Sequence, residues 1–259
     1  MSDLHLEVGQ QYSTFSFGVT APFLLLAGDI GRLLDYDGYL GFLQGLAPRY
    51  RKVFLVLGNH EFYGLDHGSG LDAARRLSRE PSLADTVVVL NKTRWDDPDS
   101  NLTILGCTLW SAISDEARGV VEAKVNDFKK MGAWTARKHN EVHADEVAWL
   151  RHQVSLARGR LLLVATHHAP CLEGTSQPGH SDNPWSSAFA TDLLAQEGWG
   201  GVSVWVFGHT HYSTDFSLPS GIRLVANQRG YVLPCMTDGS RTNKGGHDFD
   251  AAMSITMGS

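Results

Sequence analysis

Cysteine is scarce in this sequence of 259 residues, which holds only 3. Cys107, Cys171 and Cys235 lie far apart, and no Cys-x-x-C pair occurs. An odd number of scattered cysteines argues against a disulfide framework and against structural zinc–thiolate sites, and it favours a reducing compartment. We therefore expect a cytoplasmic protein.

The sequence also lacks long apolar runs and an excess of positive charge. No run approaches the roughly 20 apolar residues of a membrane-spanning helix, and no charged and then apolar leader opens the chain, so we expect neither membrane insertion nor secretion. The formal net charge is -6, with 22 Lys and Arg against 28 Asp and Glu. Without a basic stripe, the chain lacks the electrostatic features of a general nucleic-acid binder.

The sequence does have a globular composition, with 42% hydrophobic residues, and it has 12 histidines. Four short apolar runs each end in a polar cluster, and their length and β-branched content predict buried strands at 23–27, 53–57, 161–166 and 202–207. Between them lie helix-like stretches at 39–47, 71–79, 136–156 and 187–196. Alternation of strands and helices predicts a largely parallel sheet that is covered by helices.

The rest of the chain predicts a second sheet and two loop-rich segments. Strand patterns occur at 214–218, 222–226 and 253–257, while 91–101 is typical of a turn between two strands and 171–187 of a loop. The helical stretch at about 114–159 is a long excursion from the sheet that can form a lid. Because no repeat, low-complexity tract or linker divides the chain, we predict that residues 1–259 form a single domain.

Polar side chains with metal-binding chemistry accompany these strands. In chain order they are Asp3-x-His5, Gly28-Asp29, Gly58-Asn59-His60-Glu61, Thr166-His167-His168 and Gly208-His209-x-His211. Ligands of open α/β sheets collect beyond the carboxyl ends of strands. Carboxylate, amide oxygen and imidazole suit divalent ions such as Mn, Fe, Zn or Ni. Residues at i and i+2 of an extended segment point the same way, so each x-separated pair can reach one site. A glycine before Asp29, Asn59 and His209 lets the chain turn sharply.

These five motifs, in this order and spacing, resemble those of the calcineurin-like metallophosphoesterase superfamily, and the resemblance runs from Asp3 to His211. It implies an α/β fold in which a two-sheet sandwich is flanked by helices (four layers, αββα), with a dinuclear metal site at the carboxyl ends of the strands. It also implies two ligand sets. One metal is expected to take Asp3, His5, Asp29 and His211. The other is expected to take Asn59, His167, His209 and again Asp29, which bridges the two.

The resemblance further implies a metal-dependent phosphoesterase that uses two divalent transition-metal ions, with Mn expected first. Such ions clamp the phosphate oxygens and lower the pKa of a bridging water, which gives a hydroxide for in-line attack on phosphorus. We expect Asp29 and His60 to be the catalytic residues. His60 is expected to protonate the leaving oxygen or to steady charge on the phosphate. Glu61 is expected to orient the His60 ring.

Several other side chains stay open. In the family pattern, Thr or Ser is followed by the ligand His and, shortly after, by Pro. This pattern favours His167 as the ligand and leaves His168 as a phosphate contact or a pocket wall. His139 and His143 lack the order of His-Glu-x-x-His, and a solvated helix face explains them better than a metal site. Arg229 offers a bidentate fork for phosphate, although it can also be a surface arginine. The further candidates for substrate contacts are the loop residues His67, His180, Asn183 and Trp185.

The chain departs from the family pattern at its start. An apolar strand normally leads into the first Asp, whereas here Met1-Ser2-Asp3 opens the sequence and most of that strand is missing. Either the true start lies upstream, or the copy is truncated and its first metal site is weakened. In this chain we expect Asp3 and His5 near a free and mobile terminus. Arg32 stands where purple acid phosphatases have a ligand tyrosine, and the Val-Asp-Arg-Gly element of phosphoprotein phosphatases is absent. The opening is similar to that of small bacterial and phage phosphodiesterase-like members.

Three functions fit these patterns. The first is hydrolysis of a small, nucleotide-like phosphodiester or phosphomonoester. The second is a DNA-repair-type nuclease of the same superfamily, which the net charge of -6 disfavours. The third is a protein-binding scaffold that has lost catalysis, which the retained ligand positions and His60 disfavour. We expect a small phosphate ester as the partner, and neither a membrane nor long nucleic acid.

Overall fold

The computed structural model describes residues 1–179, 183–233 and 248–258, whose strands form two sheets. The smaller sheet has the order β1-β2-β3 and is parallel throughout. The larger sheet has the order β4-β5-β6-β7-β9-β8, and its edge strands β4 and β8 are antiparallel to their neighbours. The strands are β1 (Phe23–Ala27), β2 (Lys52–Val56), β3 (Val87–Leu90), β4 (Thr93–Asp96), β5 (Leu102–Cys107), β6 (Leu161–Thr166), β7 (Val202–Phe207), β8 (Thr214–Ser217) and β9 (Arg223–Ala226).

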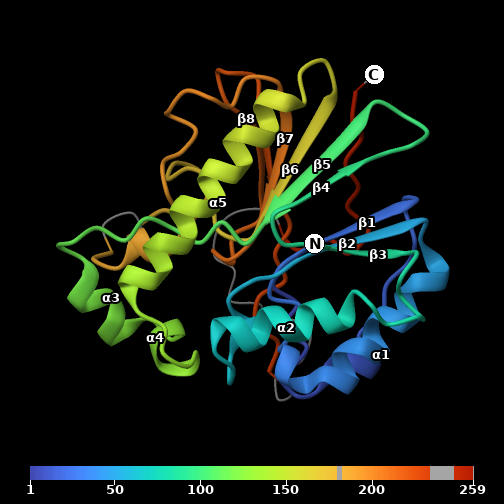
Figure 1. Cartoon of the computed structure of the whole chain (residues 1–259), viewed down its shortest axis with the longest axis horizontal. Coiled ribbons are helices and arrows are strands. Elements are labelled where there is room, and N and C mark those ends of the chain that lie inside the picture. The colour runs from blue at the N-terminus through green and yellow to red at the C-terminus, as the bar shows by residue number, and fades with distance from the viewer. Residues whose placement is uncertain (180–182, 234–247, 259) are drawn as a thin grey trace.

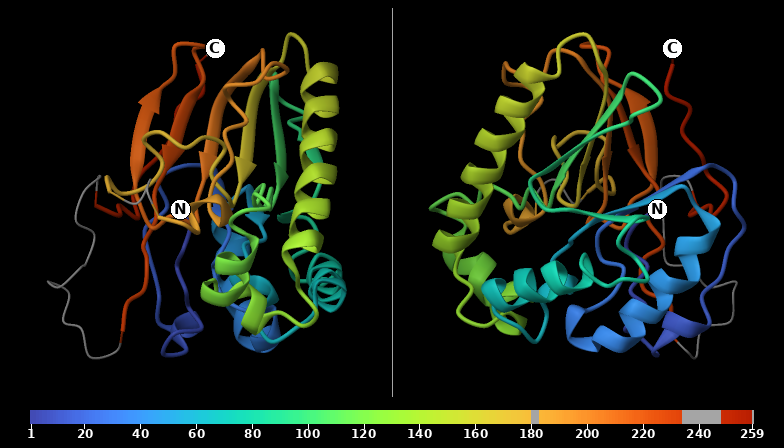
Figure 2. Two further views of the ribbon diagram at one scale, coloured as in Figure 1. Left: turned by 90° about the vertical axis from the view of Figure 1, so that its left-hand side faces the viewer. Right: turned by 45° about the vertical axis from the view of Figure 1, so that its right-hand side comes forward.

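Helices cover the outer faces of the two sheets (Figure 1; Figure 2). α1 (Tyr36–Leu46) and α2 (His67–Leu77) lie against the smaller sheet, and α5 (Ala136–Leu156) runs along the larger one. α3 (Arg118–Lys124) and α4 (Asp127–Lys130) precede α5. Short 3-10 helices occur at Gln11–Ser13, Leu33–Asp35, Ala47–Arg49, His60–Phe62 and Ser186–Ala188. In the described part of the chain, no helix is both long enough and apolar enough to cross a membrane.

Three apolar clusters separate the layers. Phe42 of α1 packs with Leu26 of β1 beneath the smaller sheet. Leu150 of α5 and Trp205 of β7 belong to the cluster on the outer face of the larger sheet. Phe54 of β2 belongs to a third cluster, which contains residues of both sheets and lies between them. The order of layers is therefore helix, sheet, sheet, helix, which confirms the predicted two-sheet sandwich.

β1 shows why the continuous apolar runs form strands here. Leu24 and Leu26 belong to the cluster under the helices, whereas Phe23, Leu25 and Ala27 pack in the cluster between the sheets. Both faces of the strand are covered, so alternation of polar and apolar residues is not required. Each fully buried leucine contributes about 2 kcal/mol through the apolar area that it removes from water. The strand ends at Ala27, which places Gly28 and Asp29 at its carboxyl end.

The helix expected at 187–196 is wrong. The segment has one short 3-10 helix, Ser186–Ala188, followed by turns. Its backbone bonds to a neighbouring loop, because the Thr191 amide donates to the Ala169 carbonyl at 3.2 Å and the Leu193 amide donates to the Pro170 carbonyl at 3.0 Å. These tertiary hydrogen bonds replace those that a helix would make, so packing overrides a helix-favouring composition.

Two strand expectations also need correction. The segment 253–257 forms no strand ladder in the described part of the chain. Met253, Ile255 and Met257 nevertheless pack, partly buried, against the cluster between the sheets, so the alternating pattern marks the side of the segment that faces the core. The expected turn at 91–101 is shorter, since Thr93–Asp96 is β4 and pairs antiparallel with β5.

The start of the chain lies between the two sheets rather than loosely at the surface. The Ala27 amide donates to the Met1 carbonyl at 2.9 Å, and the Ser2 amide donates to the Asn227 carbonyl at 3.0 Å. Asp3 and His5 are 0% exposed. The expectation of a loosely held Asp3 and His5 is therefore not met, because backbone hydrogen bonds to the ends of β1 and β9 hold this segment.

Candidate metal centre and substrate pocket

Two of the glycines that precede site residues are needed chiefly for space. A Cβ on Gly58 would lie 2.2 Å from Asp29 Oδ1, and a Cβ on Gly208 would lie 2.8 Å from Asp3 Oδ2. Only Gly28, with a φ of 87°, also has the left-handed backbone that favours glycine. The expectation that all three glycines serve sharp turns is thus corrected. At Gly58 and Gly208 the backbone must approach a carboxylate more closely than any side chain allows.

Left-handed backbone conformations are concentrated at the site. Among the described residues, ten residues other than glycine have a positive φ, and five of them are Asp3, His5, Asp29, His209 and His211. Such conformations cost about 1–3 kcal/mol each and persist where surrounding contacts enforce them. The fold therefore holds these side chains in strained positions, as is common where the arrangement serves binding or catalysis.

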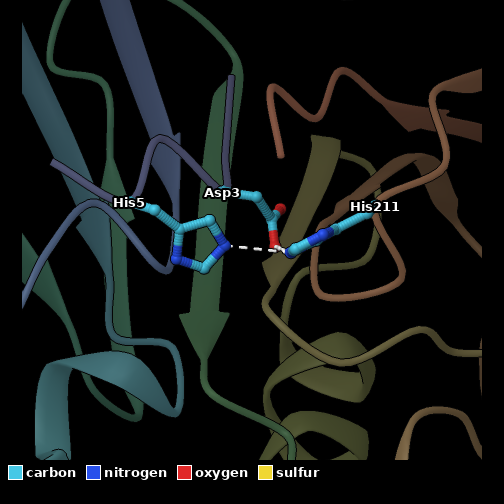
Figure 3. A group of neighbouring side chains, drawn as sticks. All are labelled: Asp3, His5 and His211. Atoms are coloured by element: carbon cyan, nitrogen blue, oxygen red, sulfur yellow. Dashed lines mark hydrogen bonds and ion pairs between the residues drawn. The ribbon is translucent and has the colours of Figure 1, made fainter. Parts of the chain in front are cut away.

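Asp3, His5 and His211 form the first group of converging side chains (Figure 3). His5 Nε2 lies 2.9 Å from His211 Nε2, and His211 Nε2 lies 3.5 Å from Asp3 Oδ1. Asp3 and His5 come from the segment between the sheets, whereas His211 follows β7. Two ring nitrogens and a carboxylate oxygen thus meet at one point.

Asp29, His167 and His209 form the second group, and Asn59 joins it. His167 Nε2 lies 3.0 Å from Asn59 Oδ1 and 3.3 Å from Asp29 Oδ1. The other nitrogen of His167, Nδ1, lies 3.0 Å from the Ala27 carbonyl, which accepts its proton and leaves Nε2 to face the group. These side chains follow β1, β2, β6 and β7. The sequence predicted that one parallel sheet would hold these four strands, but β1 and β2 lie in the smaller sheet and β6 and β7 in the larger one, so the carboxyl ends of strands from both sheets meet at the site.

The two groups are linked through His5 and Asp29, and they fit divalent cations. His5, Asp29 and His60 form a third group, so Asp29 belongs to two of the three, and the ligand atoms of each lie within 4.8 Å of one another. His209 Nε2 is buried without a hydrogen-bond partner among the described residues. Burying an imidazole nitrogen without a hydrogen-bond partner costs free energy, and coordination to a bound cation would offset that cost. The donor set of carboxylate, amide and imidazole is one that transition ions accept.

The pKa values show that this cluster attracts positive charge. Burial opposes ionisation of Asp29, but the nearby His167 and His60 hold the pKa of its carboxyl well below the usual range. Burial also opposes the charged form of His167, yet the Asp29 carboxylate raises the pKa of that imidazole to about 10. The proton that the raised pKa places on His167 Nε2 lies between Asp29 Oδ1 and Asn59 Oδ1. A bound cation would suit the same position.

His60 is held by two side chains whose roles the sequence did not indicate. Its Nδ1 lies 2.7 Å from Glu7 Oε1, and its Nε2 lies 3.0 Å from the Tyr231 hydroxyl. Burial lowers the pKa of His60, but Asp29 and the hydrogen bond to Glu7 raise it above its ordinary value. A raised pKa suits a group that donates a proton.

Glu61 does not orient His60, and this expectation is corrected. Glu61 Oε2 accepts from the Asp29 amide at 2.9 Å and from the Gly58 amide at 2.6 Å, while Oε1 accepts from the Ile30 amide at 2.8 Å. The side chain is 0% exposed. Glu61 therefore links the turns after β1 and β2 through hydrogen bonds to their backbone amides. The carboxylate beside His60 is that of Glu7.

Asn59 is oriented by a residue of the helical excursion. Its Nδ2 donates to Asp127 Oδ1 at 2.8 Å and to the Tyr63 hydroxyl at 3.1 Å. Because both amide hydrogens are engaged there, Oδ1 is turned toward His167 and the candidate metal centre. The loop after β7 is organised in a similar way, since Gln228 Oε1 accepts from the His211 amide at 2.5 Å.

A cavity of about 550 Å³ opens directly over the cluster. Its floor includes Asp29, Asn59 and His60, and its walls include aromatic side chains from the 171–190 loop. Trp185 and Asn183 line it, as the sequence suggested. The helical excursion contributes a wall at residues 124–127. This cavity is of the size and character of a small-molecule site.

The other expected substrate contacts lie elsewhere. His168 is 0% exposed, and its ring packs 4.0 Å from that of His209 rather than lining the cavity. The Arg229 guanidinium donates to the Leu4 carbonyl at 3.1 Å and to Gln11 Oε1 at 2.8 Å, so its fork is engaged away from the cavity. His67 packs on Phe62 and Trp134. His180 lies outside the described residues.

His139 and His143 are not on a solvated helix face, which corrects that interpretation. Both are buried on the inner side of α5. His139 Nε2 accepts from the Ser111 amide at 3.0 Å, and His143 Nδ1 donates to the Leu109 carbonyl at 2.7 Å. Burial lowers the pKa of both rings, so they stay neutral. They are core residues that satisfy backbone groups at the end of β5.

Four residues important to the geometry were missed: Glu7, Asp127, Gln228 and Tyr231. Glu7 follows His5 by two positions, but His5 has a left-handed backbone and residues 6–10 form a turn, so the spacing rule for an extended segment does not apply. Asp127 and Tyr231 carry no local signal either, because only the tertiary fold brings them to the site.

Comparison with known proteins identifies the family of this chain. Residues 1–213 match the model of the calcineurin-like phosphoesterase family, and the chain belongs to that family. It is 29% identical over 227 residues to the uncharacterized protein L509 of Acanthamoeba polyphaga mimivirus, covering 81% of this chain and 78% of that one. The fold resembles that of a phosphopantetheinyl hydrolase from Mycobacterium tuberculosis, with a TM-score of 0.67 and 18% identity over 89% of this chain and 88% of that one.

A dimetal phosphatase from Danio rerio has a similar fold, with a TM-score of 0.50 and 15% identity over 80% of this chain and 72% of that one. At these identities the two structures speak for the fold alone. Family membership, the layered fold and the His and Asp groups together define a metal-dependent phosphoric ester hydrolase.

Proposed function

We propose that this chain hydrolyses a small, nucleotide-like phosphodiester or phosphomonoester at a dinuclear metal centre. The observation that carries the proposal is the convergence of two ligand groups, linked through His5 and Asp29, beneath a cavity of about 550 Å³. A cavity of this volume suits a small ester. Residues 1–259 act as one catalytic domain, which the apolar cluster shared by both sheets supports.

The residues that would hold the two ions are those around Asp29. One set is Asp3, His5, Asp29 and His211; the other is Asp29, Asn59, His167 and His209. Mn is the first candidate, and Fe, Zn or Ni also suit these donors. Two bound divalent ions would supply Lewis acidity toward the phosphate and lower the pKa of bound water for in-line attack.

The protein side chains position the reacting groups. Glu7 accepts the Nδ1 proton of His60, which fixes the tautomer and directs Nε2 to the cavity. His60 is the source of the proton for the leaving oxygen. Asp127 and Tyr63 keep the Asn59 oxygen turned to the centre. No protein nucleophile is required.

The cavity walls favour a small organic ester over long nucleic acid. Trp185 and Phe189 line the walls, and Lys124 is the one lysine or arginine among the described lining residues. A binding site for long nucleic acid would present a basic stripe, so the nuclease alternative is disfavoured. The scaffold alternative is disfavoured because the side chains that would hold the metal ions converge at one site.

Two further proposals concern the excursion and the location of the protein. The excursion at about 114–159 acts as a lid over the cavity, whose lining includes residues 124–127. The free, buried thiols of Cys107 and Cys171 support a cytoplasmic location.

Hydrolysis of bis-4-nitrophenyl phosphate and 4-nitrophenyl phosphate with added Mn tests the proposal. Wild type is expected to release nitrophenolate, and Asp29→Ala is expected to lose this activity together with bound metal. Asp72→Ala is the matched control, because Asp72 is 72% exposed on α2 and pairs only with Arg75 in the described chain. If wild type is as inert as Asp29→Ala, the proposed function is wrong. A preference between the two esters separates diesterase from monoesterase action.

A further inference from the structure

The Tyr231 hydroxyl lies beside the candidate acid, His60, and both residues line the cavity. Its oxygen lies 3.0 Å from His60 Nε2. The Tyr231 ring stacks on His5, with centroids 4.1 Å apart and an interplanar angle of 24°. The side chain is 48% exposed and lines the cavity. Contacts with His5 and His60 thus hold the Tyr231 side chain in place, and its exposed side faces the cavity.

Nδ1 of His60 cannot donate a proton to a substrate in the cavity, because it is hydrogen-bonded to Glu7. This nitrogen lies 2.7 Å from Glu7 Oε1, and Glu7 is itself buried beside His5 Nδ1 at 3.5 Å. Any proton that His60 gives to a substrate must therefore leave from Nε2. That atom already has the Tyr231 oxygen at hydrogen-bond distance.

A phenol hydroxyl can accept one hydrogen bond and donate another at the same time. Tyr231 can therefore accept the Nε2 proton of His60 on one side and present its own hydrogen to an oxygen in the cavity. Direct transfer from His60 to a leaving oxygen would require that oxygen to occupy the place where the Tyr231 hydroxyl now lies.

We propose that Tyr231 is a catalytic residue that relays the proton of His60 to the leaving oxygen; this rests on the proposed function. As the bond between phosphorus and the leaving oxygen breaks, the oxygen takes the hydroxyl hydrogen of Tyr231 and leaves as the alcohol. The Tyr231 oxygen takes the Nε2 proton of His60 in the same step. His60 changes from imidazolium to neutral imidazole, and Tyr231 ends the step unchanged.

The relay matters only for substrates whose leaving group needs a proton. A nitrophenolate leaves without protonation, whereas an unactivated phenol or an aliphatic alcohol must receive a proton as it departs. Tyr231 therefore serves esters of poor leaving groups. The natural substrate is accordingly an ester of an ordinary alcohol, whose oxygen reaches the Tyr231 hydroxyl when the phosphate lies over Asp29.

Tyr231→Phe removes the hydroxyl and keeps the ring on His5. With Mn present, kcat for phenyl phosphate is expected to fall about tenfold to a hundredfold, while kcat for 4-nitrophenyl phosphate changes little. KM and metal content are expected to stay as in wild type. Tyr50→Phe, in the apolar cluster beneath the smaller sheet, is the matched control and is expected to change neither rate.

A second readout does not depend on the loaded enzyme. In metal-free protein, the ¹⁵N resonance of His60 Nε2 is expected to shift in Tyr231→Phe and to stay in place in Tyr50→Phe. An equal loss on both substrates, no loss on either, or an unshifted His60 resonance would overturn the relay. Wild type that is inert on both substrates would instead remove the proposed function, whereas activity of Tyr231→Phe on 4-nitrophenyl phosphate alone preserves it.

Discussion

Asp127 Oδ1 lies 2.8 Å from Asn59 Nδ2, so a carboxylate at the start of α4 determines which atom of the Asn59 amide faces the candidate metal centre. The two residues are 68 positions apart in the chain. Tyr63 donates to the same Asp127 oxygen at 2.8 Å. The helical excursion therefore contributes to the site in two ways, as a wall of the cavity and as the support of one proposed ligand.

Replacing Asp127 is expected to weaken metal binding without removing a proposed ligand. In Asp127→Ala the Asn59 amide is free to rotate, and we expect Mn affinity to fall about tenfold to a hundredfold, as for other residues that hold metal ligands. Asp127→Asn keeps an acceptor oxygen and is expected to recover part of the affinity. Calorimetric titration of metal-free protein with Mn measures this, with Asp115→Ala, 81% exposed in the same excursion, as the control. Equal affinity in Asp127→Ala and wild type would refute the role.

Glu7→Gln is expected to slow catalysis rather than unfold the protein. The amide keeps the size of the side chain but removes the charge that supports the imidazolium form of His60. We expect kcat for phenyl phosphate to fall roughly tenfold or more. Steady-state kinetics with the exposed Glu141→Gln of α5 as the control measure the effect. A loss confined to KM would speak against this role of Glu7.

Glu61 is expected to matter for stability. Glu61→Ala would leave the buried amides of Asp29, Ile30 and Gly58 without their acceptor, at about 1–3 kcal/mol for each unsatisfied group. We therefore expect a fall of roughly 3 kcal/mol or more in the free energy of unfolding. Urea denaturation of metal-free protein measures it without interference from bound metal. A variant as stable as wild type would show that water replaces these hydrogen bonds.

Gly58→Ala tests the need for space at the end of β2. Its Cβ would lie 2.2 Å from Asp29 Oδ1, which must shift, and so we expect loss of metal binding along with lower stability. Gly45→Ala is the matched control, because nothing lies within 4 Å of its Cβ and it stands within α1. The control is expected to gain up to about 1 kcal/mol of stability from helix propensity. Normal Mn binding by Gly58→Ala would contradict the assigned geometry.

The sequence predicted the main strands and the meeting of the polar clusters, because both follow from local pattern. Buried parallel strands read as apolar runs, and polar clusters follow their carboxyl ends, although β1 and β2 belong to one sheet and β6 and β7 to the other. The contact of Glu7 with His60 spans 53 positions and depends on how segments pack, which no local pattern encodes. The expected helix at 187–196 failed for the same reason, because bonds to Ala169 and Pro170 take its backbone groups. Glu61 was assigned to the wrong partner because adjacency in sequence does not determine side-chain direction.

The central claim is that two metal ions share Asp29. Titration of metal-free protein with Mn, with the bound metal counted by elemental analysis, tests this most directly. Wild type is expected to bind two ions per chain, and Asp29→Ala is expected to lose both high-affinity sites while Asp72→Ala keeps them. Binding of a single ion by wild type, or two ions bound equally well by Asp29→Ala, would contradict the account.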